Sequence, residues 1–298
     1  MAMNLFRKVL SLVGLAGLLL AAPAYAAEDC DRQCLEGMLD GYVAAMLSHD
    51  HTSLPLADDA EYTEGGRAVA MGEGAWQTIT GKGSFRHDYL DTTKQVAAAH
   101  IHFLEGDMPV LVSVALHVDA GEISGIETIV ARITPESPFQ PAVLGEQVRG
   151  MDTPVPAGMR QSREEMVRIA LGYAEGLRIG NFEDVGVPFA PEVYRVENGV
   201  ITAGQGCFGS VCGLYDQRIM VHPGLIPSVV AVDEENGTVL LWMNFGFTDS
   251  YGPGNALVTF EAFKIWGGSI HAINAFFDFL PIGRSRGWPS EDRVPRLY

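Results

Sequence analysis

Apolar residues recur at helical spacing near the start of each half of the chain, in residues 34–50 and 162–181. A pattern of i, i+3, i+4 and i+7 is typical of a helix that buries one face. Ser162 and Glu165 form a capping-box pattern at the start of the second segment. The pattern predicts two amphipathic helices. Their buried positions are Leu35, Met38, Leu39, Tyr42, Val43, Met46 and Leu47, and then Met166, Ile169, Ala170, Tyr173 and Leu177.

Strand patterns follow each predicted helix. Residues 109–133 read as a strand, a glycine turn and a second strand. Residues 255–279 read in the same way, with Gly267 and Gly268 at the hairpin turn, and residues 238–247 read as a further strand. The order of a helix, a short strand and several long strands therefore occurs twice.

Two pairs of stretches show that the second half repeats the first. LPLADDAEYTEGG (residues 54–66) and VPFAPEVYRVENG (residues 187–199) carry Pro, Ala, Glu and Gly at the same offsets. The closing stretches GEISGIETIVAR (residues 121–132) and GSIHAINAFFDF (residues 268–279) also align. Together with the helices, these blocks predict a tandem duplication in which each copy has an ordinary domain size.

The duplication divides the chain into five expected parts. Residues 1–26 are expected to be a signal peptide, and residues 27–133 the first copy. Residues 134–160 are rich in proline and are expected to be a linker. Residues 161–284 form the second copy and residues 285–298 a C-terminal tail. Periodicity alone predicts two α+β domains.

The first 26 residues have the pattern of a secretory signal. Arg7 and Lys8 precede a long apolar run, and Ala24, Tyr25 and Ala26 match an A-x-A cleavage site. We expect cleavage after Ala26. The mature protein is then exported, either periplasmic or secreted, and has no stable insertion in a membrane.

Export places four cysteines in an oxidising compartment, where disulfides are the usual state. Cys30, Cys34, Cys207 and Cys212 allow three pairings, and the sequence does not choose among them. Neither close pair has the C-x-x-C spacing common in zinc sites. We therefore expect disulfides and no metal.

An excess of acidic residues narrows the range of partners. Without Arg7 and Lys8, 18 Lys and Arg residues stand against 37 Asp and Glu residues, a net charge near −19. Such a chain is a poor match for nucleic acid or for an anionic membrane surface. A small molecule is the expected partner.

On these features each copy resembles the nuclear-transport-factor-2-like, or SnoaL-like, superfamily. The matching features are the first helix with Tyr42 or Tyr173, the segments PLADDAEYTEGG and PFAPEVYRVENG, and the closing hairpins. The resemblance implies two cone-shaped α+β barrels, each a curved antiparallel sheet wrapped around N-terminal helices and an apolar pocket. Members include isomerases, cyclases, dehydratases and lyases that usually need no cofactor, and others that only bind ligands or proteins. The resemblance therefore leaves the function open.

In the first copy, histidines and a tyrosine interrupt apolar strands. FRHDYL (residues 85–90) places His87 and Tyr89 on one strand face, as a base and an oxyanion donor. His100 and His102 share a face of another strand, but a third metal ligand is not evident. The alternative is that these side chains lie on a hydrated edge or surface.

In the second copy, YDQRIMVH (residues 215–222) carries a cluster of polar residues. If this segment is a strand, Asp216, Arg218 and His222 share one face. Burial would tune such groups for proton transfer. The alternative is a structural ion pair between Asp216 and Arg218.

The closing strand of the second copy carries a candidate acid. Asn274, Phe276 and Asp278 share a face, and related sequences often end in an aromatic-aromatic-Asp element near the pocket mouth. Apolar neighbours are expected to raise the pKa of Asp278. We therefore expect Asp278→Asn to lower turnover by about 100-fold or more.

Three functions are compatible with the sequence. We expect a cofactor-independent lyase, dehydratase or isomerase acting on a small, mostly apolar, cyclic or aromatic molecule. The alternatives are an exported binding protein with the same pocket, and a structural module in which the copies pack as a pseudo-dimer, with or without further homo-oligomerisation. The catalytic candidates are Asp278, His222, Asp216, His87 and Tyr89. The ligand-binding candidates are Trp76, Trp242, Trp266, Arg218 and Asn274, although tryptophans also fill cores.

Overall fold

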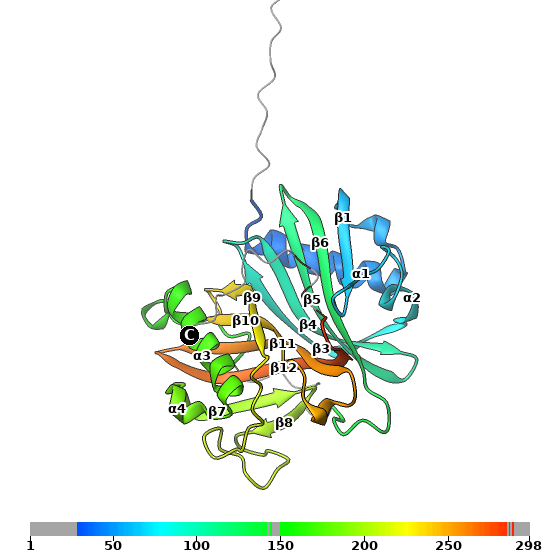
Figure 1. Ribbon diagram of the computed structural model, residues 1–298. Helices are drawn as coiled ribbons and strands as arrows, with labels where there is room; N and C mark the ends of the chain where they lie inside the picture. Colours follow the sequence, from blue (N-terminus) through cyan, green and yellow to red (C-terminus); the bar gives the residue numbers. More distant parts are fainter. Residues whose placement is uncertain (1–28, 142–143, 145–149, 285, 287, 289–298) are drawn as a thin grey trace, which may run out of the picture.

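The computed structural model describes residues 29–141, 144, 150–284, 286 and 288. The chain forms two α+β units of the same plan, each an N-terminal helix packed on a curved, six-stranded mixed sheet (Figure 1). The expected signal peptide, and most of the expected C-terminal tail, lie outside the described residues.

The first unit begins with helix α1 (Arg32–Ser48) and a turn of 3-10 helix, η1 (His51–Ser53). A short helix, α2 (Ala75–Thr78), lies between its second and third strands. The strands are β1 (Leu56–Glu64), β2 (Arg67–Ala68), β3 (Gly81–Asp91), β4 (Val96–Glu105), β5 (Met108–Asp119) and β6 (Glu122–Arg132). Their order in the sheet is β2-β1-β6-β5-β4-β3.

The second unit follows a 3-10 turn, η2 (Ala157–Met159), and begins with helices α3 (Arg163–Ile179) and α4 (Phe182–Val185). Another 3-10 turn, η3 (Asp249–Tyr251), follows its fourth strand. The strands are β7 (Phe189–Glu197), β8 (Val200–Ala203), β9 (Ile226–Asp233), β10 (Thr238–Asn244), β11 (Asn255–Trp266) and β12 (Ser269–Pro281). Their order, β8-β7-β12-β11-β10-β9, matches the first sheet strand for strand. The predicted tandem α+β fold is confirmed.

Each sheet is mixed rather than wholly antiparallel. β1 runs parallel to β6, and β7 runs parallel to β12, whereas the other neighbouring strands are antiparallel. The two strands of each parallel pair are far apart in the sequence. The chain passes through the three other long strands of the unit before the last strand returns beside the first. The expected antiparallel sheet is therefore wrong at this one pairing.

Side chains and left-handed residues set the ends of the two long helices. The side chains of Asp31 and Ser162 accept hydrogen bonds from the backbone N–H groups of Cys34 and Glu165. At the other ends, His49 and Gly180 adopt left-handed conformations. The N-terminal cap predicted at Ser162 is confirmed.

Both faces of each sheet are buried. One face packs against the unit's own helix, α1 or α3, and we call these two cores the first cone and the second cone. The other faces pack against each other and form a third core, the sheet–sheet core. Side chains such as Tyr89, Ile129, Phe260 and Phe276 belong to this third core.

Two ion pairs cross between the units in a symmetrical way. Arg32 at the start of α1 contacts Asp233 at the end of β9, with a nitrogen–oxygen distance of 2.7 Å. Arg163 at the start of α3 contacts Asp91 at the end of β3, at 2.6 Å. Each carboxylate also accepts a backbone N–H from the opposite unit, of Leu90 and Val232 respectively. We call these contacts the crossed ion pairs.

Both disulfides close short loops, Cys30–Cys34 before and within α1 and Cys207–Cys212 between β8 and β9. None of the four cysteines is free, so the predicted oxidation is confirmed. Disulfides are typical of extracytoplasmic proteins. Within the described part of the chain, none of the helices has both the length and the apolar character needed to cross a membrane.

Candidate functional site

A hollow of about 480 Å³ lies at the mouth of the second cone. Its walls come from α3, β7, β11, η3 and the long connection between β8 and β9, residues 204–225, which we call the cover loop. The apolar lining residues are Leu177, Val211, Ile219, Met220, Phe245 and Leu257. The polar or charged ones are Arg195, Glu197, Ser210, Gln217, Arg218, His222 and Tyr251.

Arg195 is a largely buried cation in the wall of this hollow. Its Nε donates to Thr202 Oγ1 at 2.9 Å, its Nη1 to Tyr173 OH at 3.1 Å and its Nη2 to Gln217 Oε1 at 2.9 Å. The carboxylate of Glu197 lies 3.2 Å from Nε. Burial by itself lowers the pKa of Arg195, but Glu197 and Tyr173 raise it above its ordinary value. The guanidinium is thus a charged group held in one orientation.

A carboxyl group is buried behind Arg195. Glu261 on β11 is 2% exposed, and strand alternation places it on the same face as Leu257, which lines the hollow. Tyr173 hydrogen-bonds to Glu261, whose Oε1 has no partner among the described residues. Burial, followed by the charge of Glu197, raises the pKa of Glu261 to about 8, although Arg195 opposes this. Glu261 is therefore protonated at neutral pH.

His222 and Tyr251 form a neutral pair in the wall of the hollow. His222 Nε2 lies 2.6 Å from Tyr251 OH, and the two rings are nearly parallel. His222 Nδ1 is buried and has no partner among the described residues. Burial lowers the pKa of His222, while burial and the charge of Glu197 raise the pKa of Tyr251 to about 12. The pair presents an uncharged imidazole and an uncharged phenol.

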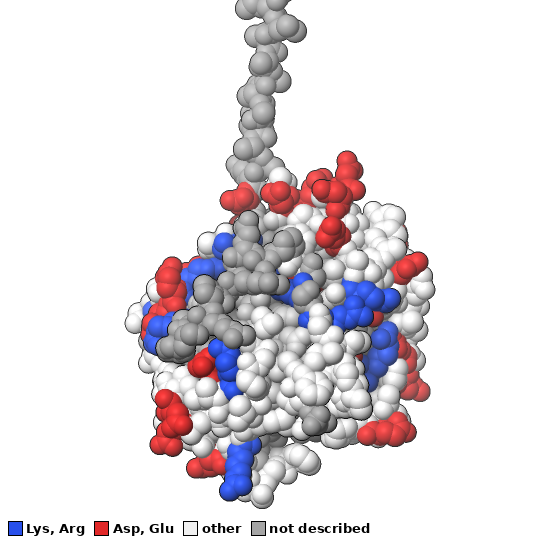
Figure 2. Space-filling model, viewed as in Figure 1, with Lys and Arg blue, Asp and Glu red and all other residues white. Residues whose placement is uncertain are grey.

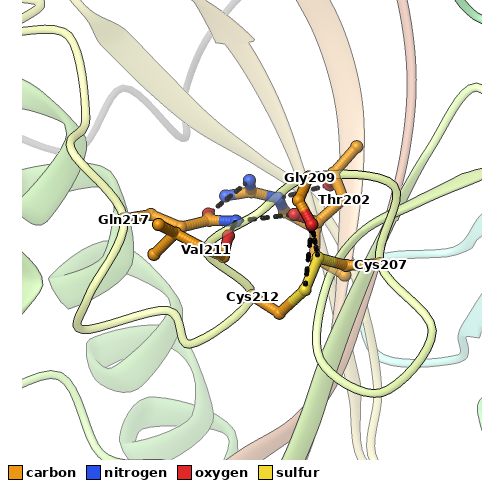
Figure 3. The surroundings of a disulfide bond; sticks show 7 residues. Thr202, Cys207, Gly209, Val211, Cys212 and Gln217 are labelled. Carbon is orange, nitrogen blue, oxygen red and sulfur yellow. Dashed lines mark hydrogen bonds between the residues drawn. A yellow bond between two sulfur atoms is a disulfide. The ribbon is translucent and has the colours of Figure 1, made fainter.

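Gln217 connects the cover loop to the buried guanidinium (Figure 3). Its amide nitrogen donates to the carbonyl oxygens of Thr202 and Val211, at 2.6 and 3.1 Å, and its amide oxygen accepts from Arg195. Val211 lies inside the ring closed by the disulfide Cys207–Cys212. Gln217 therefore fixes the position of the disulfide-closed part of the cover loop relative to the guanidinium of Arg195.

The first cone is filled at the corresponding place. Trp76 on α2 is 1% exposed and packs edge-on against Tyr42 and Tyr62, with ring centroids 5.5 and 6.4 Å apart. Glu64 accepts hydrogen bonds from Tyr62 OH and from the backbone N–H of Ala75, the first residue of α2. The short helix therefore holds an aromatic side chain in the cone.

Two residues predicted from the sequence, His222 and Arg218, line the hollow. Both come from the cover loop, which the structure describes throughout and which contains no strand, so the condition under which Asp216, Arg218 and His222 would share one strand face is not met. The backbone turns here because the N–H of Asp216 bonds to the carbonyl of Gly213. Asp216 lines a neighbouring hollow of about 430 Å³ instead.

Asp278 and Asn274 lie on the other side of the second sheet. Asp278 pairs with Val258, a member of the sheet–sheet core, and Asn274 Nδ2 lies 3.0 Å from His100 Nδ1. Burial raises the pKa of Asp278, in the direction that its apolar neighbours suggest. The side chain does not line the hollow, because it lies on the face of the sheet that packs against the first unit and not on the face toward α3.

His87 and Tyr89 share a face of β3, but this face belongs to the sheet–sheet core. Tyr89 OH donates to His100 Nδ1 at 3.0 Å, and His100 Nε2 donates to Phe260 O at 3.1 Å. Burial lowers the pKa of His87 to about 4 and that of His100 to about 3. The His100 nitrogens are occupied, and no cluster of three or more His, Cys, Asp or Glu among the described residues is placed to hold a metal.

The three candidate tryptophans lie in three different places. Trp76 fills the first cone and Trp242 belongs to the sheet–sheet core. Trp266 stacks on His271, with ring centroids 3.7 Å apart, in a separate hollow of about 510 Å³ that Glu192 also lines. Packing therefore accounts for Trp76 and Trp242.

The sequence did not indicate Arg195 and Tyr251 in the hollow, or Glu261 buried behind it. Arg195 occupies the offset of Tyr62 in the repeated stretch, and Glu261 interrupts the apolar run VTFEAF, so both had a detectable signal. Tyr251 lies in a short 3-10 turn, and no periodic pattern marks it.

Comparison with known families identifies the two units as one repeated domain. A family model described as Domain of unknown function (DUF8021) matches residues 28–130 and 159–277. The two segments begin before α1 and α3 and end within β6 and β12, the last strand of each unit. Among curated proteins, none matches the chain.

Proposed function

Because the chain belongs to the family described as Domain of unknown function (DUF8021), which assigns no activity, we propose its function from the chemistry of the hollow in the second cone. We infer a cofactor-independent lyase, dehydratase or isomerase for a small, mostly apolar, cyclic or aromatic molecule. One observation carries this proposal: a neutral imidazole, a phenol and a fixed guanidinium, from His222, Tyr251 and Arg195, line a single hollow whose other walls are partly apolar.

The scaffold and the location belong to the same proposal. A helix packed on a curved six-stranded sheet, repeated in tandem, supports the nuclear-transport-factor-2-like interpretation of both units. The two disulfides support a periplasmic or secreted location.

His222 is the proposed general base. Its lowered pKa keeps the imidazole neutral at neutral pH, and Nδ1 is the nitrogen without a partner. In this tautomer Nε2 carries the proton and donates to Tyr251 OH, which fixes the orientation of the ring. A base positioned in this way contributes about 100-fold or more to a rate.

Arg195 is the proposed stabiliser of negative charge. When a base removes a proton from a carbon beside a carbonyl group, the C–H electron pair forms a C=C bond and the C=O π pair moves to the oxygen, where a fixed guanidinium stabilises the oxyanion. Where the substrate has a neighbouring C=C bond, return of the proton to the far carbon of the resulting dienolate shifts that double bond, re-forms the carbonyl group and completes an isomerisation. Departure of a neighbouring hydroxyl, which takes the proton and leaves as water, completes a dehydration.

Glu261 and Tyr173 are proposed as positioning residues. The neutral carboxyl of Glu261 leaves the positive charge of Arg195 opposed by Glu197 alone, while Tyr173 accepts from Arg195 and bonds to Glu261. The pair therefore preserves both the orientation and the charge of the guanidinium.

A ligand screen with product analysis tests the proposal. Thermal-shift assays against aromatic and steroid-like compounds would identify ligands, and mass spectrometry would detect conversion of each one. We expect turnover that His222→Gln lowers by about 100-fold and that His271→Gln, a control in the separate hollow, leaves intact. Ligands that bind without any conversion would instead make the protein a binding protein.

A further inference from the structure

We propose that the ligand of this hollow is an apolar molecule that carries one carboxylate, and that Arg218 binds this carboxylate at the mouth. The inference rests on the proposed function, since it places the ligand in the same hollow. It goes further by assigning the charge of the ligand and the residue that recognises it.

The charges that line the hollow favour an anion. Three lining residues are charged, Arg195, Glu197 and Arg218. Arg195 and Glu197 form an ion pair, so their charges offset each other. Glu261 behind them is neutral, because burial raises its pKa. One positive charge is left over, and it belongs to Arg218.

Arg218 is available to a ligand. Its side chain is exposed, and it makes no hydrogen bond or ion pair with any residue that the structure describes. Many other arginines are already paired with carboxylates: Arg32, Arg86, Arg132, Arg163, Arg168, Arg178 and Arg286. An unpaired guanidinium beside a hollow is a site where a carboxylate can form two parallel hydrogen bonds.

The acidic surface makes this local charge decisive. The protein carries a net charge of −17, and Figure 2 shows acidic side chains spread around the margins of one face. An anion is repelled by such a surface and gains only where the local charge is positive. Binding of an anion in this hollow therefore depends on a local positive charge such as that of Arg218.

The remaining walls define the other end of the ligand. Leu177, Phe245 and Leu257 are apolar, and a volume of about 480 Å³ suits one small molecule. With its carboxylate on Arg218, the apolar body of the ligand would lie in the cone. His222 and Arg195 line the same hollow and would face that body.

Matched acids and amides test this inference by binding alone. Calorimetry would compare 3-phenylpropionate and 2-naphthylacetate with their primary amides, on the full mature chain at neutral pH and low salt. We expect the acids to bind about 10-fold more tightly than the amides, and Arg218→Gln to remove this preference without weakening amide binding. Arg218→Lys keeps the charge without the planar fork, so it should retain an intermediate preference.

Arg67→Gln is the control, because it removes the same charge from an exposed site on β2 of the first unit and should keep the preference. Equal binding of acids and amides, binding of neither, or a preference that survives Arg218→Gln would overturn the inference. Preferred binding of acids that are never converted would overturn the proposed catalysis alone. Conversion of neutral compounds without any preference for acids would overturn this inference alone.

Discussion

The two cones share a framework and differ in their contents. Tyr42 and Tyr173 occupy the same position in α1 and α3, and both are fully buried. Around them, the first cone contains Trp76 above an apolar floor, whereas the second contains Arg195 and Glu261 beneath the cover loop. The first cone is therefore filled by an aromatic side chain, whereas the second contains polar groups beside its hollow.

The exchange can be followed position by position. Alignment of the repeated stretches matches Tyr62 with Arg195, and the strand registers match Val114 on β5 with Glu261 on β11. A buried charge is costly unless it is paired, and a buried polar group is costly unless it is hydrogen-bonded. Retaining such groups in a core is typical of a functional site.

At one matched position of the repeated stretches, both units carry a glutamate, but the two glutamates make different contacts. Glu64 and Glu197 occupy equivalent positions in the repeated stretch. Glu64 accepts the N–H of Ala75 and so anchors α2 over the first cone. Glu197 instead pairs with Arg195 at the open hollow. The difference depends on whether a helix or a loop follows the second strand.

Removing the Trp76 side chain, which fills the first cone, should have the largest effect on stability. Trp76→Ala leaves a cavity in the first cone, and we expect it to lower the free energy of unfolding by about 3–5 kcal/mol. Phe208→Ala at the tip of the cover loop, where the side chain is 84% exposed, should change it by less than about 0.5 kcal/mol. Urea denaturation measures the free energy of unfolding of both variants. Similar losses for Trp76→Ala and Phe208→Ala would contradict the contrast between the filled first cone and the exposed cover loop.

The catalytic assignment gives the next largest effect. Once a substrate is known, His222→Gln should lower turnover by about 100-fold while ligand affinity changes little, because the base acts on the transition state. Asp278→Asn, on the sheet–sheet side, should stay near the wild-type rate. The reverse result would move the chemistry out of the second cone.

The buried carboxyl should make stability depend on pH. The pKa of Glu261 is about 8 in the folded protein and 4.5 ordinarily, so its contribution is full below pH 4.5 and is lost as pH rises toward 8. Glu261→Gln removes this titration. Between about pH 6 and pH 8 we expect the variant to lose about 2 kcal/mol less stability than the wild type. Urea denaturation at several pH values measures the free energy of unfolding of both proteins. If this free energy has the same dependence on pH in the two proteins, Glu261 is already ionised in the folded state.

Removing Gln217, which joins the cover loop to Arg195, should have the smallest effect. Gln217→Ala removes the contacts from Arg195 to the loop, and we expect about a 5-fold loss of turnover, the equivalent of one hydrogen bond. Hydrogen exchange should become faster at residues 207–212, whereas the first unit should be unaffected. Unchanged exchange in the loop would mean that the disulfide alone fixes it.

The sequence was sufficient for the architecture because periodicity is a property of each element. Helical spacing and the repeated stretches predicted the two units, and the capping pattern at Ser162 predicted where α3 begins. The same alternation could not place the site. Each sheet is buried on both sides, so alternation separates two faces without telling which one meets the helix. This is why His87 and Asp278 were expected in a pocket and lie toward the opposite sheet.

The cover loop shows the second limit of sequence reasoning. His222 and Arg218 were chosen because their side chains are chemically conspicuous, and both line the hollow although this loop contains no strand. Tyr251 comes from a different segment and meets His222 only through the fold. Contacts of this kind have no periodic signature.

The crossed ion pairs make the two halves of the gene product dependent on each other during synthesis. Asp91 is synthesised 72 residues before Arg163, its partner. Arg32 is synthesised 201 residues before Asp233, its partner. Until then the first sheet exposes an apolar face to water and to other nascent chains. We expect residues 27–133 to aggregate when expressed alone and to be rescued by co-expression of residues 161–298. A solubility assay of the two fragments, separately and together, measures this dependence.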